Sequence, residues 1–395
     1  MRYLFSLLIV FWFVRIDANA LELPVRGAGI CFGNASIFKG FRFNWSDRGV
    51  KEVSGFNLSL WRPGANDDAR LNGFLIGLWG PSGDRLQGIS CGLYKIRANE
   101  LKGMALSLVG IENHGSCHGI AISGIGMGGR GGMTGIAVAG IGMGFNSYIR
   151  GISLAGIGMG AQGDICGISI AGIGMGCQGS IKGIALGGIG LGCQGGISGL
   201  VLGGIGLGTE GKIRGIAGGL LGLGAEKGIQ GLAFGGLGLG TGGDIDGIVM
   251  GGLGLGGGGI LRGIAIGGLG IGMGMDLNGI ALAGLGVGAG QNIRGLVIGG
   301  CGLGAGNSLT GIGLTAGYAK IPLIKGWVTA GYVRGQNLIG ISLGGYNRFL
   351  GTQKGLAIGV INYAQELKGA QVGLINIAKN NPLWARVLPL LNLHL

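Results

Sequence analysis

A few residues have types and spacing that could support chemistry. Glu112 stands close to His114-Gly-Ser-Cys117-His118, which is the only local grouping of metal-ligating side chains. A zinc site needs three or four converging ligands. The whole chain has three His, and the third, His394, is remote in sequence. We therefore interpret this segment as a polar edge, with His114, Cys117 and His118 kept as weak metal candidates, and expect no bound metal or cofactor.

The chain has seven cysteines, at positions 31, 91, 117, 166, 177, 193 and 301. In an exported protein they could be oxidised, and the odd number leaves at least one unpaired or intermolecular. Cys177 and Cys193 occupy the same position in adjacent repeats. If adjacent repeats lie side by side in parallel, these two residues come within disulfide range.

Strings such as Gly124-Ile-Gly126-Met-Gly128 imitate dinucleotide-binding loops. They recur every 16 residues and lack the strand-to-helix context of such loops. No Ser-His-Asp or Cys-His arrangement can be nominated, so we expect no enzymatic activity and identify no small-molecule substrate.

The glycines belong to a repeat. Gly makes up 102 of the 395 residues, whereas charged residues are 11%. From 119 to 310 the chain consists of twelve repeats of 16 residues, each starting with Gly at position 1. Positions 1, 8 and 10 are always Gly, positions 2 and 7 are almost always Ile or Leu, and position 15 is always apolar. Repeats of this length indicate a stacked array.

The apolar pairs at positions 2 and 4 and at 7 and 9 have the alternation of strands. A corner at positions 5 and 6, helped by the backbone freedom of Gly, would turn both pairs inward. We therefore predict an all-β fold, a parallel β-solenoid of 14–16-residue coils. Large apolar residues would fill its interior, and the small residues of positions 3 and 8 would form flat Gly/Ala-rich faces. The alternative is an up-and-down transmembrane β-barrel with one strand per repeat.

Four segments are expected. Residues 1–20 have the features of a signal peptide: Arg2, an apolar stretch from Tyr3 to Val14, and the small-residue cleavage motif Ala18-Asn19-Ala20. Residues 21–118 hold irregular repeats and a cap, residues 119–310 the perfect block, and residues 311–395 shorter repeats of 14–15 residues and a second cap. Terminal repeats differ because they must close the stack.

The C-terminal repeats Lys354-Gly-Leu-Ala-Ile-Gly-Val-Ile-Asn-Tyr-Ala364 and Lys368-Gly-Ala-Gln-Val-Gly-Leu-Ile-Asn-Ile-Ala378 resemble those of bacterial glycine-rich surface-repeat proteins of unknown function. The Ile-Ala-Ile-Gly pattern is more weakly similar to the head repeats of trimeric autotransporter adhesins. The first resemblance implies an exported protein at the bacterial cell surface or outer membrane, without known catalysis. An adhesin role would rest on analogy of fold alone.

Function is expected to follow from surfaces. A large uncharged face indicates a partner, a lipid or another copy. We therefore expect a non-enzymatic surface or envelope protein acting in adhesion or assembly, with an outer-membrane barrel, as a pore or envelope scaffold, as the alternative. Homo-oligomers and contact with a membrane or surface polysaccharide are the expected partners. The net charge is +13, and residues 318–395 carry eight basic residues and one acidic residue. Because the charges are scattered and the chain is expected to be exported, nucleic acid is not an expected partner.

Overall fold

In the computed structural model, residues 15–17, 20–23 and 27–394 are described. Most of the predicted signal peptide lies outside these residues. The chain comprises two compact units, one up to Gln194 and one from Gly195 onward. Almost all secondary structure in the described residues is β-strand, with one short 3-10 helix near the C-terminus.

The N-terminal unit is a stack of parallel coils. Its first three strands, β1 (Arg15–Asp17), β2 (Ala20–Leu23) and β3 (Ala28–Gly33), pair antiparallel with one another, and β3 then pairs parallel with β4. The strands that cross position 1 of each repeat are β4 (Ile37–Asn44), β5 (Glu52–Ser59), β6 (Arg70–Gly77), β7 (Ser82–Gly92), β8 (Lys95–Ser107), β10 (Cys117–Ser123), β12 (Met133–Ala139), β14 (Ile149–Ala155), β16 (Ile165–Ala171) and β18 (Ile181–Gly187). The shorter strands between them are β9 (Gly110–Asn113), β11 (Gly126–Gly129), β13 (Gly142–Phe145), β15 (Gly158–Ala161), β17 (Gly174–Cys177) and β19 (Gly190–Cys193).

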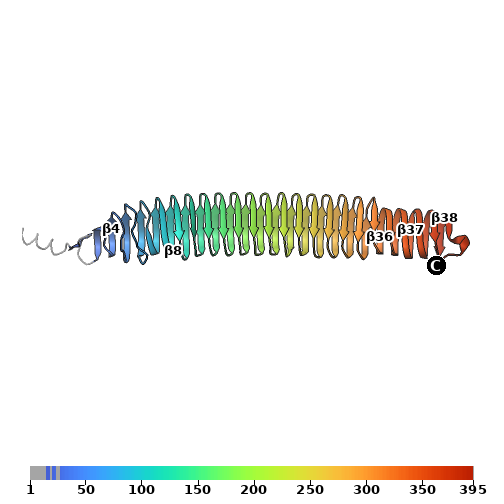
Figure 1. The fold of residues 1–395 in the computed structure, drawn as a ribbon, viewed down its shortest axis with the longest axis horizontal. Helices are drawn as coiled ribbons and strands as arrows, with labels where there is room; N and C mark the ends of the chain where they lie inside the picture. The colour runs from blue at the N-terminus through green and yellow to red at the C-terminus, as the bar shows by residue number, and fades with distance from the viewer. Residues whose placement is uncertain (1–14, 18–19, 24–26, 395) are drawn as a thin grey trace, which may run out of the picture. The chain divides into compact units, whose positions relative to one another are not determined.

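The C-terminal unit repeats this arrangement. Its long strands are β20 (Ile197–Gly203), β22 (Ile213–Gly219), β24 (Gly228–Gly235), β26 (Asp244–Gly251), β28 (Leu261–Gly267), β30 (Leu277–Ala283), β32 (Asn292–Gly299), β34 (Ser308–Leu314), β36 (Leu323–Gly335) and the continuous β37 (Asn337–Ala378). Its short strands are β21 (Gly206–Thr209), β23 (Gly222–Ala225), β25 (Gly238–Thr241), β27 (Gly254–Gly257), β29 (Gly270–Met273), β31 (Gly286–Ala289), β33 (Gly302–Ala305) and β35 (Tyr318–Lys320). After the 3-10 turn η1 (Leu383–Ala385), β38 (Val387–His394) pairs antiparallel with the end of β37, beside it in Figure 1.

Register is kept from coil to coil. In β26 and β28, Gly247 pairs with Gly263 and Ile248 with Ile264, a shift of one whole repeat. Within the perfect block of each unit, long strands pair with long strands and short with short, in parallel. This confirms the predicted parallel β-solenoid. The barrel alternative is wrong, because an up-and-down barrel pairs consecutive strands antiparallel.

The predicted distribution of side chains is wrong for the long strands and for position 7. The Ile and Leu of position 7, expected inside, form an exposed row beside the corner, which we call the corner row. Each long strand runs from about position 15 to position 5, and its side chains point alternately to its two faces. Positions 15, 3 and 5 face inward, and positions 16, 2 and 4 face outward. In β26, Val249 at position 3 is fully buried, whereas Ile248 and Met250 are 41% and 42% exposed. The small residues expected outside therefore line the interior, and the Ile and Leu expected inside lie on the surface.

The interior is filled by small residues packed against larger ones. The Ser153 hydroxyl at position 3 lies 3.4 Å from the Met159 sulfur at position 9 and 2.8 Å from the hydroxyl of Ser169 on the next coil. The side chains at positions 9 and 15, such as Met159 and Ile165, are also buried. Ala or Ser at position 3 thus leaves room for Met, Leu or Ile from the opposite strand.

Position 1 requires glycine. Gly263 has φ +127°, and a Cβ there would overlap the carbonyl oxygen of Gly247 on the preceding coil. Side chains rarely adopt this backbone conformation. The predicted corner is also present, between β28 and β29, but Gly268 at position 6 has no positive φ. Glycine is favoured there because a Cβ would overlap the Gly252 carbonyl oxygen.

Candidate functional site

The outer face of the long strands carries two parallel rows of large apolar side chains, one from position 2 and one from position 4. We call this surface the apolar ladder. In the C-terminal unit its members that are more than one-third exposed are Leu202, Ile216, Leu232, Phe234, Ile248, Met250, Ile280, Ile298, Ile312, Trp327, Ile341, Ile358 and Val372. Scattered exposed apolar residues are normal, but a contiguous row of this length is unusual for a soluble monomer.

A row of basic residues follows one margin of the apolar ladder, at position 16. In the C-terminal unit this basic row consists of Arg214, Arg262, Arg294, Lys325, Lys354 and Lys368. The coils between them carry Gln230, Asp246, Asn278, Thr310 and Ile339 at this position. Arg262 is paired with Asp246 at 2.9 Å and with Asp244 at 3.4 Å. Arg294 lies 4.0 Å from Asp276, and Lys368 lies 2.6 Å from Glu366. Within the described residues, Arg214, Lys325 and Lys354 have no ion pair, so the margin keeps an excess of positive charge.

The outer face of the short strands differs. Positions 8 and 10 face outward and are always Gly in the perfect block, so the predicted flat glycine face exists on this side only. At Gly254 and Gly272, an added Cβ would meet nothing within 4 Å. The solenoid itself therefore does not require glycine at these two positions.

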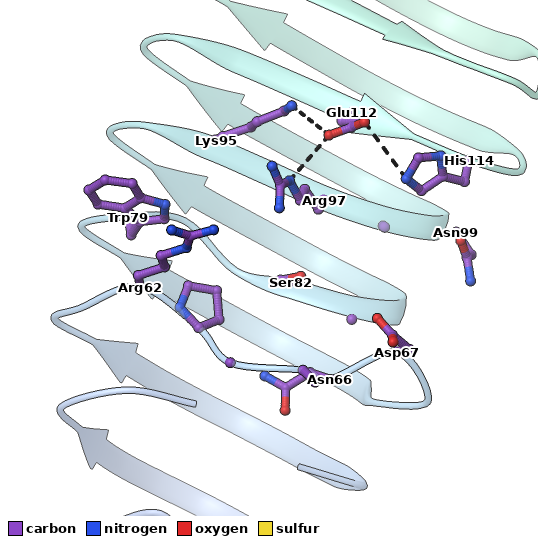
Figure 2. Close-up of a pocket in the computed structure, with 15 residues that line it drawn as sticks. Arg62, Asn66, Asp67, Trp79, Ser82, Lys95, Arg97, Asn99, Glu112 and His114 are labelled. Atoms are coloured by element: carbon purple, nitrogen blue, oxygen red, sulfur yellow. Dashed lines mark ion pairs between the residues drawn. The ribbon is translucent and has the colours of Figure 1, made fainter. Parts of the chain in front are cut away.

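In the first coils of the N-terminal unit, the same short-strand face is hollowed and polar. A pocket of about 660 Å³ lies between residues 62–67 and the coils that follow (Figure 2). Its lining includes Arg62, Asn66, Asp67, Trp79, Ser82, Lys95, Arg97, Asn99, Glu112 and His114. The coil from Gly55 to Gly73 is 18 residues long, and the segment after β5 forms no short strand, which leaves this space open.

Glu112 is the electrostatic centre of the pocket. Its carboxylate lies 2.5 Å from Lys95 Nζ, 3.2 Å from Arg97 Nε and 3.8 Å from His114 Nε2 (Figure 2). Hydrogen bonding to Lys95 and the charges of Lys95 and Arg97 hold the pKa of Glu112 below its usual value. Glu112 is therefore ionised at neutral pH and can accept hydrogen bonds from a ligand.

Trp79, in the wall of this pocket, belongs to a row of aromatic side chains. Trp45, Trp61, Trp79 and Tyr94 stand at the corners of successive coils, with ring centroids 5.9, 6.2 and 4.6 Å apart. Trp45 and Trp61 are more than half exposed. Large exposed rings with a polar edge are enriched at binding surfaces.

The structure separates the weak metal candidates. Cys117 points into the core at 2% exposure, and burial raises the pKa of its thiol to about 12. His114 is exposed on the rim of the pocket, and His118 is half-exposed on the long-strand face. Among the described residues, no group of three or more His, Cys, Asp or Glu could hold a metal ion.

Cys177 and Cys193, in contrast, are brought together. They are direct partners in the pairing of β17 with β19, and both are buried. Their proximity and their burial raise the pKa of Cys177.

Sequence reasoning missed Arg62, Trp79, Lys95 and Arg97. A signal was present, because aligning the irregular repeats with the perfect block places Lys95 and Arg97 at positions 8 and 10, where the block has only Gly. The charged pocket is thus a departure from the repeat.

No protein family, curated protein or solved structure matches this chain. No helix among the described residues is long and apolar enough to cross a membrane. Function therefore has to be argued from the surfaces themselves.

Proposed function

We propose that this chain is a non-enzymatic, exported protein of the bacterial envelope that assembles with copies of itself through the apolar ladder. The observation that carries the proposal is the exposure of position 2 and 4 side chains on coil after coil. The predicted signal peptide and the resemblance to surface-repeat proteins support the location at the cell surface.

The apolar ladder is large enough to bind a second copy. The twelve coils that begin between Gly199 and Gly369 lie about 4.8 Å apart, and positions 2 to 4 span about 10 Å. The ladder of the C-terminal unit therefore has an area of roughly 600 Å². Stable interfaces start at about 600 Å² per partner. Because both surfaces have the same repeat distance, their side chains can interdigitate along the whole row.

The basic row favours one orientation of the two copies. It lies on only one margin of the ladder, beside position 2. If the facing strands run in opposite directions, each basic row lies beyond position 4 of the partner. Like charges are then kept apart, whereas facing strands that run in the same direction would bring the rows together.

Sedimentation of the purified chain tests the proposal. In one variant, the outward residues Ile248, Met250, Ile264, Ile266, Ile280 and Leu282 are all changed to Thr, which preserves strand propensity. In the matched control, Leu253, Leu269 and Leu285 of the corner row are changed to Thr instead.

We expect the wild type and the control to sediment as oligomers and the ladder variant to shift toward monomers. Circular dichroism would establish that all three remain β-rich. A monomeric wild type, or an unchanged oligomer in the ladder variant, would contradict the proposal. So would a wild type that binds anionic vesicles without self-association, because the ladder would then serve a membrane.

A further inference from the structure

We infer that the pocket in the first coils of the N-terminal unit binds an acidic polysaccharide, a hydroxyl-rich chain that carries carboxylate groups. This site lies on the short-strand side and is separate from the apolar ladder. It therefore adds a binding activity to the proposed assembly.

The pocket has the shape for a linear chain. Its lining comes from the successive coils that begin at Gly55, Gly73, Gly88 and Gly103, so it extends across the strands rather than along one of them. Its volume of about 660 Å³ lies within the usual range of about 300–1,000 Å³ for ligand sites. A polymer could lie along the stacking direction with successive residues on successive coils.

The charges favour a carboxylated ligand. Lys95 and Arg97 are engaged by Glu112, whereas Arg62 has no ion pair within the described residues (Figure 2). A planar guanidinium is suited to bidentate binding of a carboxylate. Arg62 is exposed at the pocket and is thus the cation available to a ligand.

The other polar groups favour hydroxyls. Asp67 and Glu112 can accept hydrogen bonds. The Asn99 amide nitrogen donates one hydrogen to Asp84 at 2.9 Å and keeps a second for a ligand. The Asn66 side chain, in contrast, fixes the wall: its carbonyl oxygen accepts a hydrogen bond from the Val50 N–H, and its amide nitrogen donates to the Asp47 carbonyl.

Trp79 supplies an apolar wall. It lies on one side of the pocket, with Asp67 and Asn99 on the other (Figure 2). The C–H groups on one face of a sugar ring can pack against an indole, while the hydroxyls at its rim reach polar partners. In the perfect block the residue equivalent to Trp79 is Ile or Leu in every repeat except the last, where it is Cys301, so the stack does not need an aromatic there.

Titration calorimetry with polygalacturonate and alginate, and with neutral dextran and single-stranded DNA as comparison polymers, tests this inference. The variants are Arg62→Ala and Trp79→Leu, the second of which restores the residue type of the perfect block. The controls are Arg130→Ala, an exposed arginine outside the pocket, and Trp45→Leu, at the far end of the aromatic row.

We expect saturable binding to at least one acidic polysaccharide and weak or absent binding to dextran and DNA. Arg62→Ala and Trp79→Leu should each weaken binding by roughly tenfold or more, with both controls near wild type. No binding to either acidic polymer, equal binding to DNA, or equal losses in the control variants would overturn the inference. Thermal unfolding of each variant distinguishes lost binding from lost structure.

Discussion

Two glycines of one repeat should respond in opposite ways to the same substitution. Gly263, at position 1, has φ +127°, and its Cβ would overlap the Gly247 carbonyl oxygen. Gly272, at position 10, has open space around its Cβ position. Both lie in the C-terminal unit, nine residues apart, so each serves as a control for the other.

The magnitudes follow from these environments. Gly263→Ala forces an unfavourable backbone conformation, at about 1–3 kcal/mol, and a steric overlap, at about 1–3 kcal/mol, for a total destabilisation of about 2–6 kcal/mol. Gly272→Ala reduces the entropy of the unfolded chain and should stabilise by about 0.4–1 kcal/mol.

Hydrogen exchange of the full-length chain is a suitable assay, because long repeat arrays need not unfold as one unit. Amides of β28 and β29 should exchange faster in Gly263→Ala and no faster than wild type in Gly272→Ala. Faster exchange in Gly272→Ala, or unchanged exchange in Gly263→Ala, would refute the reasoning.

Further predictions concern the core, the thiols, a carboxylate and the leader. Asp47 pairs at 2.5 Å with the fully buried Arg42. Asp47→Ala should therefore lower the free energy of unfolding, measured by chemical denaturation, by about 3–5 kcal/mol. A loss below about 1 kcal/mol would contradict the buried ion pair. Mild oxidation should join Cys177 to Cys193 within one chain, as seen by mass spectrometry of peptides; exclusively intermolecular products would contradict their pairing. Hydrogen bonding to a lysine on the next coil holds the pKa of Asp164 below its usual value, so this carboxyl contributes stability at neutral pH that is lost as the pH falls through its lowered pKa. Asp164→Asn should therefore be less stable than wild type at neutral pH and equal to it in strong acid, and a gap that persists in acid would contradict this assignment. N-terminal sequencing of the mature chain should begin at Leu21, and an intact N-terminus would argue against cleavage after Ala20.

The period of the repeat was enough to predict coils, parallel stacking and the neighbourhood of Cys177 and Cys193. It did not predict which side chains lie inside. In a strand, residues an even number apart share a face, and residues an odd number apart lie on opposite faces. Position 15 precedes position 3 of the next repeat by an even number and position 2 by an odd number. A strand that crosses the repeat boundary therefore cannot bury both position 15 and position 2. Hydrophobicity alone favoured burying Ile248 over Val249. The large side chains at positions 9 and 15, however, fill most of the interior, so only a smaller side chain fits at position 3.

The pocket could not be predicted for a different reason. Its residues come from several coils, and its space depends on the longer loop after β5. Sequence spacing alone does not show which of the irregular repeats lacks a short strand. The charged residues at positions 8 and 10 were visible as departures from glycine, but their convergence with Trp79 and Arg62 required the stack.

The outward orientation of the apolar ladder is the central claim, and thiol labelling tests it most directly. Single cysteines at positions 248 and 249 would be introduced into a chain whose seven native cysteines are replaced, at concentrations where the chain is monomeric. Ile248→Cys should react with a maleimide readily, and Val249→Cys at least about a hundredfold more slowly, because only opening of the stack exposes it. Rapid labelling at 249 with protection at 248 would show that the large apolar side chains lie inside, and would contradict the account.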